Sequence, residues 1–268
     1  YPIISLFGLS LGTYGICCVI GGALAIWLAI RNGKRFQQDR FAMLEACVWA
    51  LIGGFLGAKL LYLLVSFSDI VEMFQTSGSH WDTISSLLEG GFVFYGGLLG
   101  GLAALLLYLH HFQLPYGVYL SSITPAVPLA HAFGRIGCFF AGCCYGIPYD
   151  PPIGICLKNA IGIAPTDIPL FPVQLLESGL DFLLAGLLQL CFRKRTRKTD
   201  VIPFYCIGYA GIRLFTERFR YDTERGIYFG LATSEWISLA LAICGVLLLL
   251  FHLSAEKGHR IPTFPSSQ

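Results

Sequence analysis

The sequence predicts an all-α integral membrane protein, a seven-transmembrane-helix bundle that forms a single transmembrane domain over residues 1–268. The chain is 55% hydrophobic and only 13% charged, with a mean hydropathy of +0.67, whereas soluble domains carry about 25% charged residues. Seven apolar stretches approach the ~20 residues that a helix needs to cross a bilayer. We expect them at about residues 8–30, 41–67, 91–110, 116–134, 172–192, 201–218 and 229–252.

The first four spans differ in what interrupts them. The first is too long for the apolar core of a signal peptide and lacks a cleavage pattern, so we expect no cleavable leader. The second contains Glu45 and Lys59, which lie about 21 Å apart along a helix and cannot pair within it. The third holds a glycine-rich stretch at 94–101 that favours close helix packing. The fourth is broken by Pro125 and Pro128.

Polar residues in the fifth and sixth spans recur at the spacing of one helix face. They are Gln174, Glu177 and Asp181 in the fifth span, and Tyr209, Arg213 and Glu217 in the sixth. Each face is either a polar seam that holds helices together or part of a functional site, since charged groups inside hydrocarbon are usually functional. A seam alone does not explain why several arginines gather at one outer end, namely Arg135, Arg213, Arg218 and Arg220.

The distribution of Lys and Arg predicts the orientation of the bundle. Basic residues fill the loop at 31–40, the loop at 193–198 and the C-terminal tail, whereas the loop at about 68–90 has none. By the positive-inside rule, the N-terminus lies outside and the C-terminus is cytoplasmic, which agrees with an odd number of spans. We therefore expect outward-facing loops at about 68–90 and 135–171. The run at 193–198 is interpreted as an orientation signal beside anionic lipid, and we expect no nucleic-acid site.

The segment at 131–146 is the most informative part of the chain. It reads His-Ala-Phe-Gly-Arg-Ile-Gly-Cys-Phe-Phe-Ala-Gly-Cys-Cys-Tyr-Gly, and it places the fixed cation of Arg135 among glycines and cysteines at the end of a hydrophobic span. An arginine at a membrane boundary is costly unless it binds something anionic. Neighbouring glycines let a ligand approach the backbone closely. The segment therefore predicts an anion-binding site.

Most of the ten cysteines lie within or at the ends of apolar spans, where a thiol behaves as a small hydrophobe. Cys138, Cys143, Cys144 and Cys156 lie instead in an outward-facing neighbourhood. Three interpretations of the first three are open. They are small structural residues, or two of them form a disulfide that shapes the loop, or they are reactive or metal-binding thiols. Because a C-x4-C-C run lacks the usual zinc spacing and His131 alone does not complete a ligand set, we expect no metal site.

Motifs along nearly the whole chain resemble those of prolipoprotein diacylglyceryl transferases. Gly134-Arg135-Ile-Gly137 matches that family's Gly-Arg-x-Gly fully, and Gly142 and Gly146 match its downstream glycines. The other similar segments are Tyr14-Gly15, Gly57-Ala-Lys59, Phe94-Tyr-Gly-Gly97, the paired Pro125 and Pro128, Pro172-Val-Gln174-Leu-Leu-Glu177, and Tyr209, Arg213 and Glu217 in a Tyr-x-x-x-Arg-x-x-x-Glu pattern.

The resemblance implies a multi-pass enzyme of the bacterial plasma (inner) membrane. Such an enzyme transfers diacylglycerol from phosphatidylglycerol to the lipobox cysteine thiol of a prolipoprotein signal peptide, without metal or cofactor. Its partners would be phosphatidylglycerol, the signal peptide and membrane lipid. The implied catalytic residues are Arg135, Arg213, Tyr95 and Glu217. The implied substrate-binding residues are Tyr14, Lys59, Gly97, Gly134, Gly137, Cys138, Cys143, Gly146, Gln174, Glu177 and Tyr209.

Three positions depart from the family pattern. The histidine of its Phe-His-Gly-Gly is Tyr95, the asparagine after its Arg-x-Gly is Cys138, and the glutamate that follows is Cys143. Because a tyrosine does not titrate near neutral pH as a histidine does, we expect a positional role for Tyr95.

Two other classes of function remain open. The first is a divergent paralogue that acts as a thiol-redox or lipid-binding membrane protein without transferase activity. The second is a transporter, for which the sequence offers no inverted repeat or pair of broken helices.

Overall fold

Helices make up most of the chain in the computed structural model, which describes residues 2–6, 9–76, 81, 84, 87, 93–157, 160, 162, 164–194, 201–221 and 226–258. The helices are α1 (Thr13–Lys34), α2 (Arg40–Val65), α3 (Phe67–Thr76), α5 (Phe94–His111), α6 (Tyr116–Ile123), α7 (Ala126–Ala141), α8 (Val173–Lys194), α9 (Val201–Glu217) and α10 (Thr233–Gly258). Two antiparallel hairpins accompany them, β1 (Ile3–Leu6) with β2 (Leu9–Gly12) and β3 (Ile227–Tyr228) with β4 (Leu231–Ala232).

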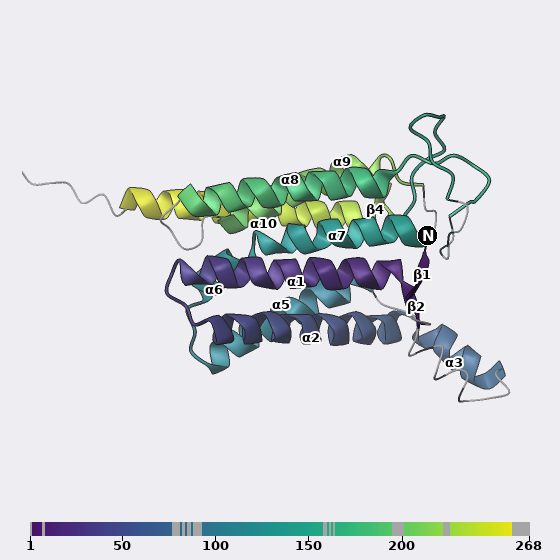
Figure 1. Cartoon of the computed structure of the whole chain (residues 1–268). Helices are drawn as coiled ribbons and strands as arrows, with labels where there is room; N and C mark the ends of the chain where they lie inside the picture. The colour runs from purple at the N-terminus through teal and green to yellow at the C-terminus, as the bar shows by residue number, and fades with distance from the viewer. Residues whose placement is uncertain are drawn as a thin grey trace, which may run out of the picture. The chain divides into compact units, whose positions relative to one another are not determined.

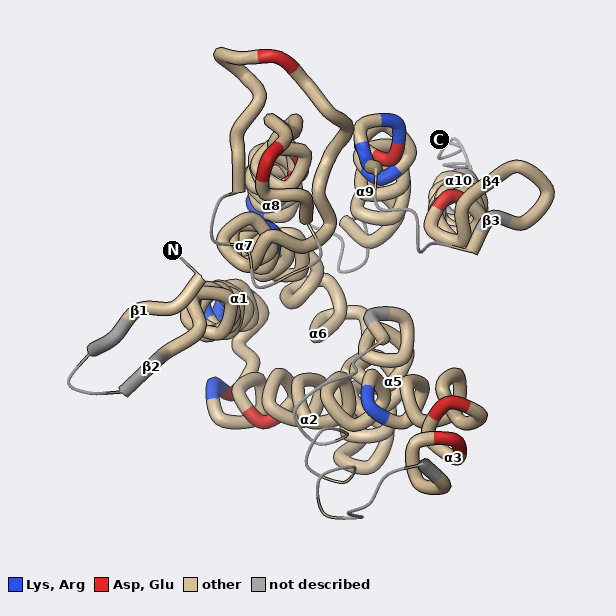
Figure 2. Tube along the Cα trace, turned by 90° about the vertical axis from the view of Figure 1, so that its right-hand side faces the viewer, with Lys and Arg blue, Asp and Glu red and all other residues tan. Residues whose placement is uncertain are grey.

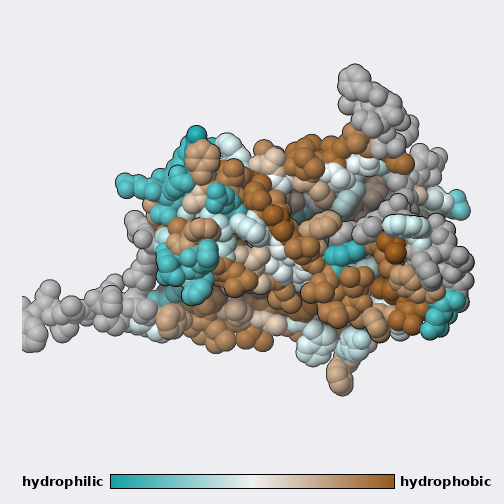
Figure 3. Space-filling model, turned by 90° about the horizontal axis from the view of Figure 1, so that it is seen from below, coloured by the Kyte–Doolittle hydropathy of each residue, from teal (hydrophilic) through white to brown (hydrophobic). Residues whose placement is uncertain are grey.

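Four of the described helices, α1, α2, α8 and α10, are long and apolar enough to cross a membrane. Many of their large apolar side chains face outward, as at Val19, Leu183 and Phe251. Hydrophobic residues also cover much of the face shown in Figure 3, and most of each helix in Figure 2 carries no charge. Extensive apolar exposure along helices of this length is typical of contact with lipid. The chain is therefore a mostly helical membrane protein.

Every predicted span overlaps a helix, and three spans differ in position. The seventh begins at Thr233, because residues 231–232 form strand β4. The first begins at Thr13 because residues 9–12 form a strand of the N-terminal hairpin. The fourth is divided into α6 and α7, and α7 continues to Ala141. Pro125 is the N-cap of α7 and Pro128 lies in its first turn, where the missing N–H has no helical partner to lose. The prolines therefore start a helix that includes Arg135. The loop that was predicted to begin at residue 135 begins only after Ala141.

The basic run at 195–198, Arg260 and most of the loop at 77–92 lie outside the described residues. Contacts along the rest of the chain divide it into two compact units. Residues 1–32 and 120–268 form the first unit, in which α7 packs on α8, α8 on α9 and α9 on α10 (Figure 1). Residues 33–119 form the second, in which α2 packs along α5.

The second unit is held by close contact between the backbones of α2 and α5. A methyl group added at Gly57 would clash with the carbonyl of Gly96, so this approach requires glycine. The Tyr108 hydroxyl donates a 2.8 Å hydrogen bond to Glu45 Oε2, so the one carboxylate within α2 is bonded to α5. The glycine-rich stretch of the third predicted span thus serves helix packing.

In the first unit, the C-terminus of α7 is fixed by a tight reversal of the chain. Gly142 has a φ of 74°, a left-handed conformation that glycine adopts without strain, and its N–H donates to the carbonyls of Cys138 and Phe139. The loop that follows packs around buried Tyr145, Ala164 and Leu170. These contacts hold residues 142–146 firmly beside the ends of α7 and α8.

Candidate functional site

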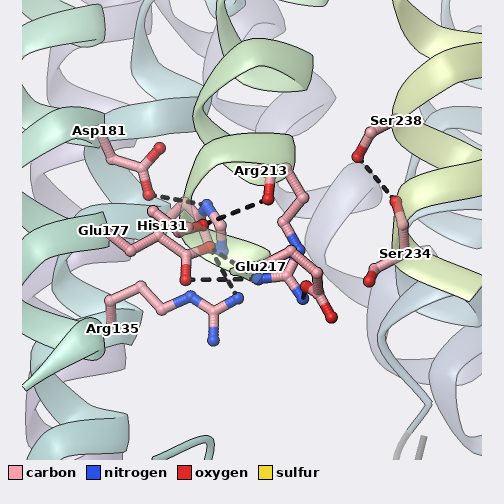
Figure 4. A network of polar contacts seen from close by, with 9 residues as sticks. His131, Arg135, Glu177, Asp181, Arg213, Glu217, Ser234 and Ser238 are labelled. Atoms are coloured by element: carbon pink, nitrogen blue, oxygen red, sulfur yellow. Dashed lines mark hydrogen bonds and ion pairs between the residues drawn. The ribbon is translucent and has the colours of Figure 1, made fainter. Parts of the chain in front are cut away.

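Charged side chains from three helices of the first unit meet in one network, shown in Figure 4. His131 and Arg135 come from α7, Glu177 and Asp181 from α8, and Arg213 and Glu217 from α9. Within each helix the two residues are four apart, so they lie one turn from each other on the same face. Three polar faces therefore come together where the helices pack.

Glu177 is the centre of this network. Its Oε1 lies 2.9 Å from Nη2 of Arg135, and its two oxygens lie 3.3 and 3.4 Å from Nη1 of Arg213. The Glu177 side chain is only 2% exposed, while those of Arg135 and Arg213 are 12% and 10% exposed. One buried carboxylate thus holds two guanidinium groups close to each other.

Glu217 completes the network on the side of α9. Its Oε2 lies 3.1 Å from Nη2 of Arg213, one turn earlier on the same helix. Glu217 therefore orients Arg213 from within α9, while Glu177 orients it from α8. The resemblance implies Glu217 as a catalytic residue, and in the structure its carboxylate contacts the guanidinium group of Arg213.

The two guanidinium groups retain hydrogen-bonding capacity. Each has five N–H donors in a planar fork that matches the oxygens of a phosphate or carboxylate. Nε of Arg135 is buried and has no hydrogen-bond partner among the residues that the structure describes. The network can therefore bind a further anion without losing the carboxylates that hold it.

His131 and Asp181 form a second pair in the same place. Nδ1 of His131 lies 2.9 Å from Oδ2 of Asp181, which is fully buried, and the edge of the imidazole meets the ring of Tyr209 at a centroid distance of 5.3 Å. This pair places an imidazole, the commonest general base in enzymes, one turn from Arg135. It was not predicted from the sequence.

The signal for the missed pair was present in the spacing. His131 precedes Arg135 by four residues and Asp181 follows Glu177 by four. Once Arg135 faces Glu177 across two antiparallel helices, the residues one turn away on each helix must also face each other. Pairing the two motifs would have predicted it.

Several predicted substrate-binding residues of the first unit have structural contacts. Gln174 is buried, and its Nε2 donates a 2.9 Å hydrogen bond to the carbonyl of Cys143. A methyl group at Gly146 would clash with the carbonyl of Phe171, so this glycine permits close packing of the loop. Gln174 and Gly146 therefore fix the loop after α7.

Other predicted residues line the surface around Arg135. A methyl group at Gly137 would lie 2.9 Å from Cδ2 of Tyr14, so α7 closely approaches that ring, and Tyr14 is 48% exposed. Gly134 has no atom within 4 Å of the place a methyl group would occupy. Cys138 and Cys143 are half-buried. Open space at Gly134 next to Arg135 is consistent with approach of a ligand to the backbone.

Lys59, Tyr95 and Gly97 belong to the second unit. Nζ of Lys59 donates to the carbonyl of Leu87 and lies 5.3 Å from the ring centroid of Tyr62. Gly97 packs against Gly54, as a small residue between helices. Tyr95 is half-buried in the first turn of α5.

Two clusters of metal-ligating side chains occur among the described residues. The ligand atoms of His131, Glu177 and Asp181 lie within 4.8 Å of one another. Arginine already neutralises Glu177 and the imidazole pairs with Asp181, so this cluster is an internal ion-pair network. The second cluster consists of the sulfur atoms of Cys138, Cys143 and Cys144.

Comparison with known proteins shows similarity over nearly the whole chain. The family model described as prolipoprotein diacylglyceryl transferase matches residues 2–251. A phosphatidylglycerol–prolipoprotein diacylglyceryl transferase of Clostridium tetani is 36% identical over 91% of this chain and 94% of its own length. A second such transferase, from Clostridium perfringens, is 32% identical over 95% of both chains, and one from Helicobacter pylori is 28% identical over 94% of this chain and 93% of its own.

Proposed function

Because the chain belongs to the prolipoprotein diacylglyceryl transferase family, we propose that it transfers diacylglycerol from phosphatidylglycerol to the lipobox cysteine thiol of a prolipoprotein. The sulfur of the acceptor attacks the glycerol carbon that bears the phosphate, so an S–C bond forms and a C–O bond breaks. Glycerol phosphate leaves with the electron pair of that bond. The observation that carries the proposal is the meeting of Arg135 and Arg213 on Glu177.

Arg135 and Arg213 would clamp the phosphate of the donor lipid. Guanidinium binds phosphate through two parallel hydrogen bonds and remains charged at every relevant pH. As the C–O bond breaks, negative charge grows on the phosphate, and donors already held in place stabilise that charge without reorganising. Glu177 and Glu217 act as positioning residues because they fix the two guanidinium groups.

His131 would take the proton from the acceptor thiol. Asp181 holds its imidazole through Nδ1, and His131 lies one turn from Arg135 on α7. The proton then passes to water, and glycerol phosphate leaves as a dianion. Tyr95 keeps a positional role, with its hydroxyl offered to the lipid headgroup. Lys59 and Gly97 are proposed to act with it in substrate binding.

The membrane arrangement completes the proposal. Seven spans with the N-terminus outside and the C-terminus cytoplasmic would place the Arg135 end of α7 toward the outer face of a bacterial inner membrane. The acyl chains of the donor would lie among the apolar helices, with Tyr14, Tyr209 and the glycines at 134 and 137 around its headgroup. Exposed apolar side chains on α1 and α8 support contact with lipid tails.

One observation favours a second function. Cys138 and Cys143 stand where the family pattern has asparagine and glutamate, and with Cys144 they form a cluster of three thiols. A lipid-binding or thiol-redox paralogue would use the same scaffold without transferring diacylglycerol. It would depend on the cysteines and tolerate loss of the arginines.

A direct assay distinguishes the two functions. Purified full-length protein in detergent is incubated with phosphatidylglycerol labelled in its glycerol backbone and a peptide that carries a lipobox cysteine. Transferase activity predicts a peptide heavier by one diacylglyceryl group and an equal amount of released glycerol phosphate. A matched peptide with serine in place of cysteine should give no product. Failure to modify the cysteine peptide, by protein that still binds the lipid, would overturn the transferase proposal.

A further inference from the structure

Three cysteines within residues 138–144 come together at the end of α7. The sulfur atoms of Cys138, Cys143 and Cys144 all lie within 4.8 Å of one another, and each side chain is half-buried. The C-x4-C-C spacing led us to expect no metal site. That expectation rested on the spacing and on the lack of a completing histidine, whereas the structure folds the segment back on itself.

The chain reversal explains why this spacing produces a cluster. Cys138 lies in the last turn of α7, and left-handed Gly142 turns the chain immediately afterward. Cys144 also has a positive φ, of 55°, which a cysteine adopts only when its surroundings impose it. Two left-handed residues within three positions thus return Cys143 and Cys144 to Cys138.

Backbone hydrogen bonds hold this arrangement independently of the thiols. The N–H groups of Gly142 and Cys143 donate to the carbonyl of Cys138 at 3.0 and 3.2 Å. Gln174 from α8 donates to the carbonyl of Cys143 at 2.9 Å, and the next residue, Tyr145, is buried. The three sulfurs are therefore brought together by the fold and are pre-organised for a shared ligand.

We propose that Cys138, Cys143 and Cys144 form a binding site for a thiophilic d10 metal ion, such as Zn²⁺, through three thiolates. Zn–S bonds of about 2.3 Å in a tetrahedral set separate the sulfurs by about 3.8 Å, which the observed cluster reaches with small side-chain movements. Thiolates select soft metals over Mg²⁺ and Ca²⁺. Three protein ligands leave the fourth position open to water or another ligand.

A fixed positive charge lies beside the cluster, because Arg135 lies one turn before Cys138 on α7. Three thiolates with one divalent ion carry a net charge of −1, which an adjacent arginine offsets.

The test uses the full chain in detergent, reduced and then freed of reductant under inert gas. Zn²⁺ affinity is measured by competition with a chromophoric chelator, and Cd²⁺ binding by the ultraviolet charge-transfer band of Cd–thiolate bonds. We expect one ion per chain. Replacing Cys138, Cys143 or Cys144 by serine should weaken binding by at least about tenfold, since loss of even an outer-shell partner costs that much.

Cys156→Ser is the matched control, because Cys156 is an exposed cysteine of the same loop. It should leave the affinity and the Cd–thiolate band unchanged, and thermal melting of each variant reports whether the fold persists. The Cd–thiolate band of the unsubstituted protein tests the site even if a variant unfolds. The proposal is overturned by absence of binding to the reduced chain, or by binding that survives the triple serine variant. Purification of the cluster as a disulfide whose reduced form binds no metal would also overturn it, in favour of a redox role. None of these readouts depends on transferase activity.

Discussion

Replacing Arg135 by lysine tests whether the guanidinium group binds the phosphate of the lipid through two hydrogen bonds. Lysine keeps the positive charge, so Glu177 is not left as an unpaired buried carboxylate, and the fold should survive. What is lost is the planar fork, since an ammonium group is a point charge with three donors and cannot reach Glu177 and a phosphate in the same bidentate geometry.

The magnitude follows from the contacts of Arg135. One N–H is committed to Glu177 at 2.9 Å, so the remaining donors are those available to the phosphate. Removing one preorganised donor to a developing oxyanion costs about 3–4 kcal/mol, or roughly 10²–10³ in rate. We expect Arg135→Lys to lower the initial rate of diacylglyceryl transfer by that factor, with a thermal midpoint close to that of the unsubstituted protein.

Arg193→Lys serves as the matched control, because Arg193 is exposed at the C-terminal end of α8, several turns from Glu177. Its rate should be unchanged. Tyr95→Phe should lose far less activity than Arg135→Lys, and Cys138→Ser should be mild if that thiol has no part in the chemistry. An Arg135→Lys variant with nearly full activity would refute the clamp. Loss of activity in Cys138→Ser alone would favour the thiol-dependent function.

Three further predictions follow from the same network and from the distribution of charge. His131→Gln should lower the rate of diacylglyceryl transfer, because a glutamine amide cannot accept the thiol proton; a rate equal to that of the unsubstituted protein would contradict this. Glu177→Gln should destabilise the fold by about 3–5 kcal/mol, since two buried guanidinium groups lose their shared carboxylate; denaturant unfolding measures it, and the Asp150→Asn change at an exposed position in the loop after α7 should be nearly neutral. A cysteine introduced at position 77 should react with a membrane-impermeant reagent added from the outside. A cysteine introduced at position 196 should react only when the reagent is added from the inside. Labelling of position 196 from the outside would reverse the proposed orientation.

Much of the helical fold could be predicted because hydrophobicity alone defines a membrane-spanning segment. Each predicted span overlaps a helix, and the polar faces of α8 and α9 follow from residue spacing. The boundaries were less accurate where local backbone chemistry decides them. Pro125 and Pro128 begin α7, and its end at Ala141 depends on the left-handed conformation of Gly142, which hydropathy does not register.

The candidate site was predictable in its residue types but not in its pairings. Arg135, Arg213 and Glu217 were identified from motifs. In the structure, Glu177 pairs with both arginines, and Glu217 pairs with Arg213. The His131–Asp181 pair depends on the register between two helices, which can be predicted only once Arg135 is paired with Glu177. Gln174 has the polarity of a ligand-binding residue, yet its amide bonds to a loop carbonyl, because a buried backbone acceptor must also be satisfied.

The charge balance of the network explains how one site can both reside in a membrane and bind an anion. Arg135 and Arg213 without counter-charges would be costly in a low-dielectric bundle, and Glu177 and Glu217 neutralise them when no lipid is bound. A phosphodiester that enters carries a single negative charge and binds to donors that the carboxylates leave unused. The leaving glycerol phosphate carries a second negative charge near Glu177, which favours its departure. The same carboxylates that position the clamp would therefore also limit how tightly it retains product, so their removal should slow release as well as weaken the fold.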